Sequence, residues 1–268
     1  MANRLLPSRY VEVVHRLALG IEAVDALRAG RIAPAIRITF DEIPLGLKRS
    51  EIMRHDSAVF ALLYDASIED TIVVRLFDGS DARWSPKTDR RRFVPRRLRV
   101  PLLAVDEADD QPVARRARRP ALFPGAAYDV ADCVTGMRGS VVAAGEPLRW
   151  ARVQAVEPVS GATVGRAHCD DRGEFLLLID SAASGLAELS DPLELDLRVH
   201  VPIVPVVSPA VRDQDALFDL PIEDLPAPGA ADSVSPGELP WPQWTPGATT
   251  PVAFPLGTIL RGHAPLAA

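Results

Sequence analysis

Proline is the residue that most limits how this chain can fold, because 25 of its 268 residues are proline. That share is about twice the usual one. A proline inside a helix removes a backbone hydrogen bond and clashes with the preceding turn, so little of the chain can form long helices. The sequence therefore predicts an all-β fold with extended segments.

The first 105 residues show apolar side chains at every second position, which is typical of half-buried strands. The alternation continues through about five short segments, and the turn signal Asp78-Gly79-Ser80 follows one of them. Strands of this length and spacing are typical of a β-sandwich. The segments are 10–24, 35–40, 59–64, 71–77 and 93–105.

A charge-dense stretch, 106–119, follows these strands and reads DEADD and then RRARR. Such blocks offer little apolar surface to offset the entropy of ordering, so we expect a solvated linker that ends a first domain at residues 1–119. This basic run and the arginines at 90–99 could bind an anionic partner. The alternation of those arginines with apolar residues favours a simpler interpretation, in which they form the solvent-facing side of a sheet.

A second domain is predicted at residues 120–210. Apolar strands at 137–143, 151–155, 164–169 and 193–199 are separated by glycine turns, and Asp170 to Gly173 is predicted to be a tight turn. The segment 175–179 is apolar without interruption, so we expect it to be buried on both faces. Four or five strands in this space would form a second compact sandwich.

Residues 211–268 differ from the rest of the chain, because they contain ten of the 25 prolines, two arginines and seven acidic residues. Large apolar residues are spread among them, and a solvated linker would not carry these. We expect an extended, proline-rich tail that wraps over a surface, either its own or that of a partner. The residues predicted to bind a partner are Trp241, Trp244, Phe254 and Leu256.

The overall charge and composition exclude several classes of protein. The formal net charge is −6, which argues against general binding to the nucleic-acid backbone. No stretch approaches the roughly 20 apolar residues of a membrane-spanning helix, and no secretion signal is recognisable. Cys133 and Cys169 are too few for a disulfide framework, and whether they are bridged or reduced stays open.

Residues 138–179 resemble a carboxypeptidase regulatory-like domain, which is a transthyretin-like β-sandwich. The resemblance rests on four motifs, with the final strands extending it over about residues 130–205. They are RGSV at Arg138–Val141, PLRWARV at Pro147–Val153, SGATVG at Ser160–Gly165 and CDDRGEF at Cys169–Phe175.

The order of the whole chain is similar to that of accessory proteins of phage-tail-like contractile injection systems. The strand motif Phe93-Val94-Pro95-Arg96-Arg97 precedes the regulatory-like segment, and a proline-rich segment follows it. The resemblance implies a structural or adaptor protein whose partners are protein subunits of a particle. We expect synthesis in the cytoplasm and incorporation into such a particle; the oligomeric state stays open.

A search of the sequence for catalytic residues finds no convincing set. None of the five histidines begins the His-x-x-Glu pair of a zinc carboxypeptidase. His168 and Cys169 are adjacent on a predicted strand and would point to opposite faces, so they cannot easily share one ion. His55-Asp56-Ser57 contains the three residue types of a catalytic triad, but adjacency in sequence is not triad geometry. We therefore predict no enzyme activity, no metal and no cofactor.

Tryptophans suggest an alternative function, the binding of a carbohydrate or another surface ligand. Trp84, Trp150 and the predicted sandwich architecture suggest it, and Trp150, Trp241 and Trp244 could together form an aromatic platform for a sugar. Trp150 could instead receive the proline-rich tail. Because interfaces between proteins favour tryptophan, assembly with a protein partner is the preferred hypothesis.

Overall fold

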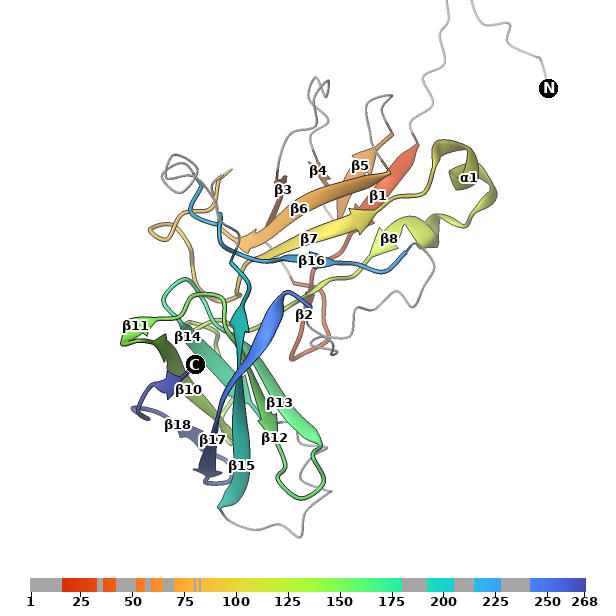
Figure 1. The fold of residues 1–268 in the computed structure, drawn as a ribbon. Coiled ribbons are helices and arrows are strands. Elements are labelled where there is room, and N and C mark those ends of the chain that lie inside the picture. Colours follow the sequence, from red (N-terminus) through yellow and green to blue (C-terminus); the bar gives the residue numbers. More distant parts are fainter. Residues whose placement is uncertain are drawn as a thin grey trace, which may run out of the picture.

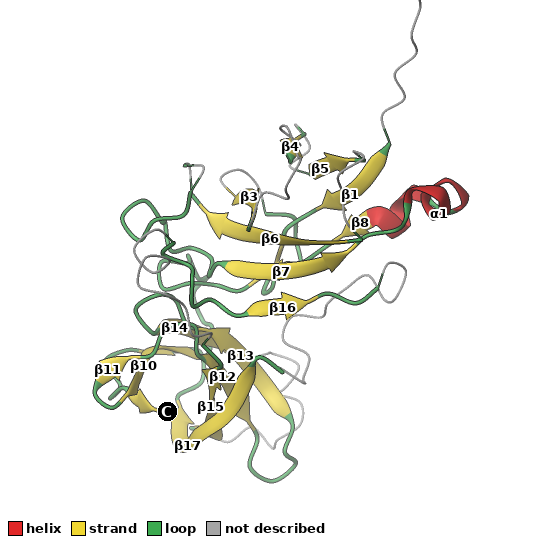
Figure 2. Ribbon diagram, turned by 45° about the horizontal axis from the view of Figure 1, so that its top comes forward, coloured by secondary structure: helices red, strands yellow, loops and turns green. Residues whose placement is uncertain are grey.

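The computed structural model describes residues 16–32, 36–41, 52–55, 59–64, 70–79, 81, 83–179, 192–204, 215–227 and 242–268. These residues form a nearly all-β structure, as the proline content and the alternation predicted (Figures 1 and 2). The part of the chain that is described contains no helix long and apolar enough to cross a membrane.

Two four-stranded sheets and a short strand pair form the first half of the molecule, called here the N-terminal sheets. One sheet has the order β4-β5-β1-β8 and the other β16-β7-β6-β3, while β2 pairs with β9. The strands are β1 (Leu17–Ile21), β2 (Val24–Asp25), β3 (Ile36–Phe40), β4 (Met53–Arg54), β5 (Phe60–Leu63), β6 (Thr71–Asp78), β7 (Arg96–Pro101), β8 (Ala117–Arg118), β9 (Ala121–Leu122) and β16 (Ile222–Asp224).

The second half, called here the C-terminal sheets, contains one sheet of order β13-β12-β15-β17 and another in which β10 joins β11, β14, β18 and β19. Its strands are β10 (Gly136–Ala143), β11 (Glu146–Pro147), β12 (Arg152–Val156), β13 (Thr163–His168), β14 (Glu174–Leu178), β15 (Leu193–Pro202), β17 (Trp244–Phe254), β18 (Ile259–Leu260) and β19 (Leu266–Ala267).

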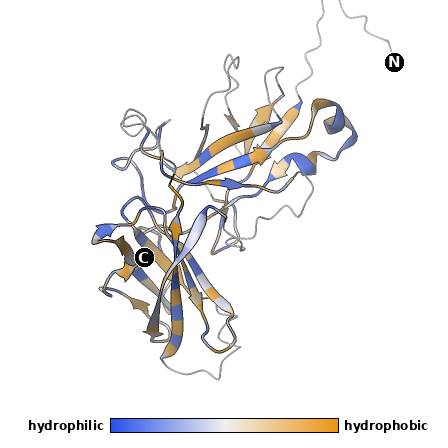
Figure 3. Cartoon of the chain, viewed as in Figure 1, coloured by the Kyte–Doolittle hydropathy of each residue, from blue (hydrophilic) through white to orange (hydrophobic). Residues whose placement is uncertain are grey.

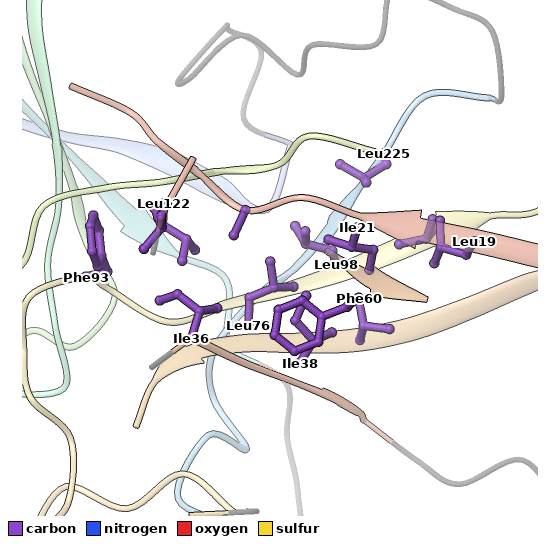
Figure 4. Packing of buried hydrophobic residues seen from close by; sticks show 14 of the residues in the cluster. Leu19, Ile21, Ile36, Ile38, Phe60, Leu76, Phe93, Leu98, Leu122 and Leu225 are labelled. Atoms are coloured by element: carbon purple, nitrogen blue, oxygen red, sulfur yellow. The ribbon is translucent and has the colours of Figure 1, made fainter. Parts of the chain in front are cut away.

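Apolar side chains from both N-terminal sheets meet in one core, in which Leu19, Ile38, Phe60 and Leu98 are buried (Figure 4). A second core lies within the C-terminal sheets and includes Phe254. The strand β14 belongs to both, because Leu177 packs in the second core while Leu176 and Leu178 pack in the first. The prediction that 175–179 is buried on both faces is therefore confirmed for Phe175 to Leu178.

Local sequence explains the turns of the C-terminal sheets. Ala144 and Gly145 both have positive φ, of 51° and 86°, which is the geometry of a tight two-residue hairpin turn between β10 and β11. Between β13 and β14, the Asp170 carboxylate accepts the backbone N–H groups of Arg172 at 2.8 Å and Glu174 at 3.0 Å. Gly173 has a φ of 72° there, as the prediction of a tight turn required.

The stretch 106–119 is ordered into short elements, although most of its described side chains are exposed, as its charges suggested. It forms helix α1 (Val105–Asp110), the 3₁₀ helix η1 (Val113–Arg116) and then β8, which pairs with β1. Arg116 donates to the backbone oxygens of Leu17 at 3.0 Å and Ala108 at 2.8 Å, and Ala108 is fully buried. The Arg116 guanidinium donates to these two carbonyl groups, so this charged side chain helps to order the segment.

The expectation of a separate C-terminal tail is not confirmed by the residues described between 215 and 268. In this stretch β16 pairs with β7, β17 with β15, and both β18 and β19 with β10. The sequence left open whether this stretch covers its own chain or a partner. In the structure it covers its own chain. The chain therefore returns twice, first to the N-terminal sheets and then to the C-terminal ones (Figure 1).

Candidate functional site: the junction between the sheets

Residues 215–226, called here the clasp, run between the N-terminal and the C-terminal sheets (Figure 2). Acidic side chains recur in the clasp every fourth residue, at Asp215, Asp219 and Glu223, and Asp224 follows directly. Each of these four carboxylates contacts at least one arginine. The clasp is thus an acidic segment held in an arginine-rich site.

The clasp begins with a two-point ion pair. Both carboxylate oxygens of Asp215 accept hydrogen bonds of 2.7 Å from Arg75 on β6. Burial is the largest single influence and would raise the pKa of Asp215, but the hydrogen bonds from Arg75 and the Leu217 N–H, together with the charges of Arg75 and Arg97, lower it. Arg75 also contacts Asp41, which in turn accepts two hydrogen bonds from Arg97 on β7. This end of the clasp is therefore fastened to the N-terminal sheets.

An apolar cluster holds the middle of the clasp against both halves of the molecule. Leu217 and Leu220 are buried together with Trp84 of the N-terminal half and Trp150 of the C-terminal half. The indole Nε1 of Trp150 donates to the Asp219 carboxylate at 2.8 Å. Trp84 and Trp150 meet edge to face, with ring centroids 6.0 Å apart. The remaining members of the cluster are Phe77 and Val94.

Glu223 lies between two buried arginines, each of which is 3% exposed. It accepts two hydrogen bonds from Arg96 on β7, at 2.9 and 2.8 Å, and its carboxylate is 2.6 Å from the guanidinium of Arg152 on β12. Burial by itself would raise the pKa of Glu223, but Arg152 and Arg96 hold it at about 2. One carboxylate thus joins a strand of the N-terminal sheets to a strand of the C-terminal sheets.

Arg152 is buried with this carboxylate and with an aromatic ring. Its guanidinium carbon lies 3.6 Å from the centroid of the Trp244 ring, which is a close cation–π contact. Burial lowers the pKa of Arg152 to about 10, while Glu223 acts in the opposite direction. A guanidinium with that pKa still carries its charge at neutral pH.

The clasp ends as a short strand. Ile222 to Asp224 pair in parallel with Arg97 to Arg99, and the outer pair Arg99–Asp224, at 2.6 Å, is about half exposed. Leu225 is buried in the first core. Arg118 then donates to the backbone oxygen of Pro226 at 3.0 Å.

A second contact joins the halves away from the clasp. Arg91, which has a φ of 57°, donates to Asp170 at 2.9 Å and to Asp171 at 2.6 Å, both in the turn between β13 and β14. Asp89, close by in the same loop, has a pKa raised to about 6, mainly by burial. The acidic turn predicted from sequence is therefore also a docking point.

The structure buries two of the four predicted partner-binding residues, Trp244 and Phe254, inside the chain itself. Trp244 is 7% exposed and its indole Nε1 donates to the backbone oxygen of Trp150 at 2.9 Å, whereas Phe254 is fully buried in the second core. Leu256 is half-buried, and Trp241 lies outside the described residues. Trp150 thus receives the C-terminal stretch, which was one of its two possible roles.

The arginines of β7 are not a solvent-facing row, which corrects the expectation from their alternation. Arg96 is 3% exposed and Arg97 is also largely buried; only Arg99 faces solvent as expected. Figure 3 shows hydrophilic bands on the otherwise hydrophobic strands β6 and β7. The arginines bind the clasp and Asp41 of the chain itself.

The residues of the clasp were missed as a site by the sequence analysis. The signal that could have found them is the four-residue spacing of the acids between buried leucines, together with an arginine-rich strand earlier in the chain. Spacing alone does not say which arginine meets which acid. The observed pairing also requires Arg149 and Arg152, which lie in the other half.

The other candidate residues are not brought together. Within the described ranges, no group of three or more His, Cys, Asp or Glu side chains could hold a metal ion. Cys169 packs in the second core while His168 stacks on Phe123, as their opposite faces predicted. Both cysteines are free thiols, Cys133 being exposed and Cys169 buried.

The remaining expectations concern His55-Asp56-Ser57 and the aromatic platform. Asp56 and Ser57 lie outside the described residues. Trp84, Trp150 and Trp244, the three described tryptophans, are 8%, 2% and 7% exposed, so none of them presents its ring to a sugar at the surface.

Comparison of the chain with protein-family models, with curated proteins and with solved structures finds no match. The chemistry of the junction is therefore the main guide to function. Its arginines bind carboxylates of the clasp and of the turn between β13 and β14, and these contacts join separate parts of the chain.

Proposed function

We propose that this protein is a non-enzymatic structural or adaptor protein that acts through contacts with other proteins. The observation that carries the proposal is that ion pairs join parts of the fold that are distant in sequence. Glu223, Asp215 and Asp170 are each bound by arginines, and these contacts connect separate parts of the fold. Such ion pairs fix one part of the fold relative to another. An adaptor protein needs binding surfaces that are held in fixed positions in this way.

Exposed apolar side chains supply candidate contact points at the two ends of the molecule. Val105 and Val113 lie at α1 and η1, beside the N-terminal sheets, and are 45% and 60% exposed. Val159 lies in the turn between β12 and β13, at the opposite end of the molecule, and is 95% exposed (Figure 1). An adaptor that joins two neighbours would use such separate ends.

The finer architecture that we propose is a pair of β-sandwich domains, of which the second is transthyretin-like. The resemblance to the carboxypeptidase regulatory-like domain supports this, since Arg138–Val141 lie on β10 and Cys169–Phe175 include the turn into β14. The similarity in order to accessory proteins of contractile injection systems supports a place in such a particle. We accordingly propose that the protein partners are particle subunits.

The test is to express the tagged full-length chain in its source cells, isolate contractile particles and quantify it against sheath and tube proteins. A fixed ratio to those proteins supports a place in the particle. Val113→Asp and Val159→Asp are expected to lower the recovered amount at least tenfold without changing the unfolding midpoint. Thr249→Asp, on the exposed face of β17, is the matched control and is expected to be recovered normally.

Two outcomes would contradict the proposal. Absence from particles would remove the particle assignment. If chemical cross-linking in the same cells also gave no protein partner in constant stoichiometry, the adaptor function itself would be wrong.

A further inference from the structure

His168 is a buried imidazole at the junction between the two halves of the molecule. It is the last residue of β13 and only 5% exposed. Its ring stacks on that of Phe123, with centroids 3.7 Å apart and an angle of 14° between the planes. Phe123 directly follows β9 of the N-terminal sheets, so the two stacked rings span the junction.

The charges around His168 are mostly positive. Arg152 is its direct neighbour across the β12–β13 ladder, and Arg96 approaches from β7. Glu223, bound to both guanidinium groups, is the carboxylate between them. His200 on β15 is the neighbour of Arg152 on the other side and is half-buried. Among the described residues, the Nε2 atom of His168 has no hydrogen-bond partner.

A proton on His168 would therefore be poorly tolerated in the closed junction. Burial, and then the charges of Arg152 and Arg96, lower the pKa of this imidazole well below its ordinary value. An imidazole released to water has a pKa of about 6.5. Protonation and closure of the junction are thus in competition.

We propose that His168 makes the junction an acid-sensitive latch, in which protonation of its imidazole separates β13 from Phe123 and β7 and frees the clasp from Arg152. The latch is a property of this chain alone and goes beyond the adaptor function. Because the open form binds the additional proton, the ratio of closed to open molecules falls by up to about tenfold for each pH unit below 6.5.

Three other groups near the junction also titrate and must be separated from His168. His200 has a pKa lowered by burial and by Arg152 and Arg198, so it acts in the same direction. Asp89 keeps a proton in the closed form up to a pH of about 6, so its titration favours closure as the pH falls. Glu223 stays ionised until the pH approaches 2.

The test uses tryptophan fluorescence, because Trp84, Trp150 and Trp244 all lie at the junction. The full-length chain with Trp241→Phe is titrated from pH 7.5 to 4.5, and hydrogen exchange, corrected for intrinsic rates, is followed in parallel. We expect a red shift and faster exchange at 117–125 and 163–170, while β17 beyond its first residues stays protected. His168→Phe keeps an aromatic stack without a proton site, so this transition is expected to disappear. His200→Asn is the matched control and should retain it.

Titration of histidine side chains by NMR in the wild-type chain provides a readout that needs no variant. The His168 signals should change at the same pH as the fluorescence. The latch is wrong if His168 titrates near pH 6.5 without a change in fluorescence, or if opening persists unchanged in His168→Phe. Loss of the transition in His200→Asn alone would also overturn the assignment. None of these outcomes bears on recovery from particles, so the latch and the proposed function are tested separately.

Discussion

Two strands from the same proline-rich stretch, β16 and β17, dock on the molecule by different physical means. β17 pairs with β15 over nine residue pairs, carries no charged residue and buries Trp244, Val252 and Phe254. β16 pairs with β7 over three residue pairs, and none of its own residues is fully buried. A long ladder with apolar anchors holds one strand, whereas ion pairs and flanking leucines hold the other.

The largest effect is expected from removing both strands. Deletion of residues 211–268 takes away β16 to β19, so β15 loses a strand partner and the second core loses Val252, Phe254 and Leu266. We expect the truncated chain to lose cooperative thermal unfolding, measured by circular dichroism and calorimetry. Cooperative unfolding at the temperature of the full chain would show instead that this stretch is a dispensable arm.

Phe254→Ala tests the apolar docking of β17. Removing a fully buried phenylalanine should lower the free energy of unfolding by about 3–5 kcal/mol, through lost burial and the cavity that remains. Thr249→Ala, at an exposed position of the same strand, should cost less than about 1 kcal/mol. Urea unfolding measures both, and equal costs would contradict anchoring by the core.

Glu223→Gln tests the electrostatic docking of β16. The amide keeps the shape of the side chain but leaves the buried guanidinium groups of Arg96 and Arg152 without their carboxylate, so we expect a loss of about 3 kcal/mol. The exposed pair of Asp224 and Arg99 supplies the control, because Asp224→Asn should cost less than about 1 kcal/mol. If the two variants were equally stable in urea, burial of the charge would not be what holds the strand.

The pH dependence separates the two strands further. Because the pKa of Glu223 is lowered to about 2 in the folded chain, its contribution to stability is present above pH 4.5 and is lost as the pH falls toward 2. Urea midpoints between pH 5 and 2.5 should fall less steeply in Glu223→Gln than in the wild type. Phe254→Ala should instead retain the wild-type slope, and a slope unchanged in Glu223→Gln would contradict the assigned pKa.

Strands were the part of the fold that sequence reasoning predicted well. The alternation in 71–77 and 93–105 corresponds to β6 and β7, and the uninterrupted apolar run at 175–179 corresponds to β14. These predictions succeed because side chains of a strand point alternately to its two faces, so local spacing records which face is buried. The Asp170 turn was also predicted from sequence, because the hydrogen bonds that form it join neighbouring residues.

The candidate site could not be predicted in the same way, because its partners are distant in sequence. Arg97 and Arg99 alternate with apolar residues in the same way, yet Arg97 is largely buried against Asp41 while Arg99 is about half exposed. Their environments differ because Asp41 and the backbone oxygen of Leu220 in the clasp cover Arg97 but not Arg99. An arginine that is solvated and one that binds a buried carboxylate have the same local pattern.

By itself, the sequence determined that this chain is built of short strands, where most of them lie, and that the C-terminal stretch carries anchors suited to docking. Only the tertiary structure decided that those anchors dock on the chain itself and that an acidic clasp joins the two halves. The physical reason is that hydrophobic periodicity is a local property. The pairing of a buried carboxylate with arginines depends instead on which surfaces meet and exclude water, and this is settled only when the sheets pack.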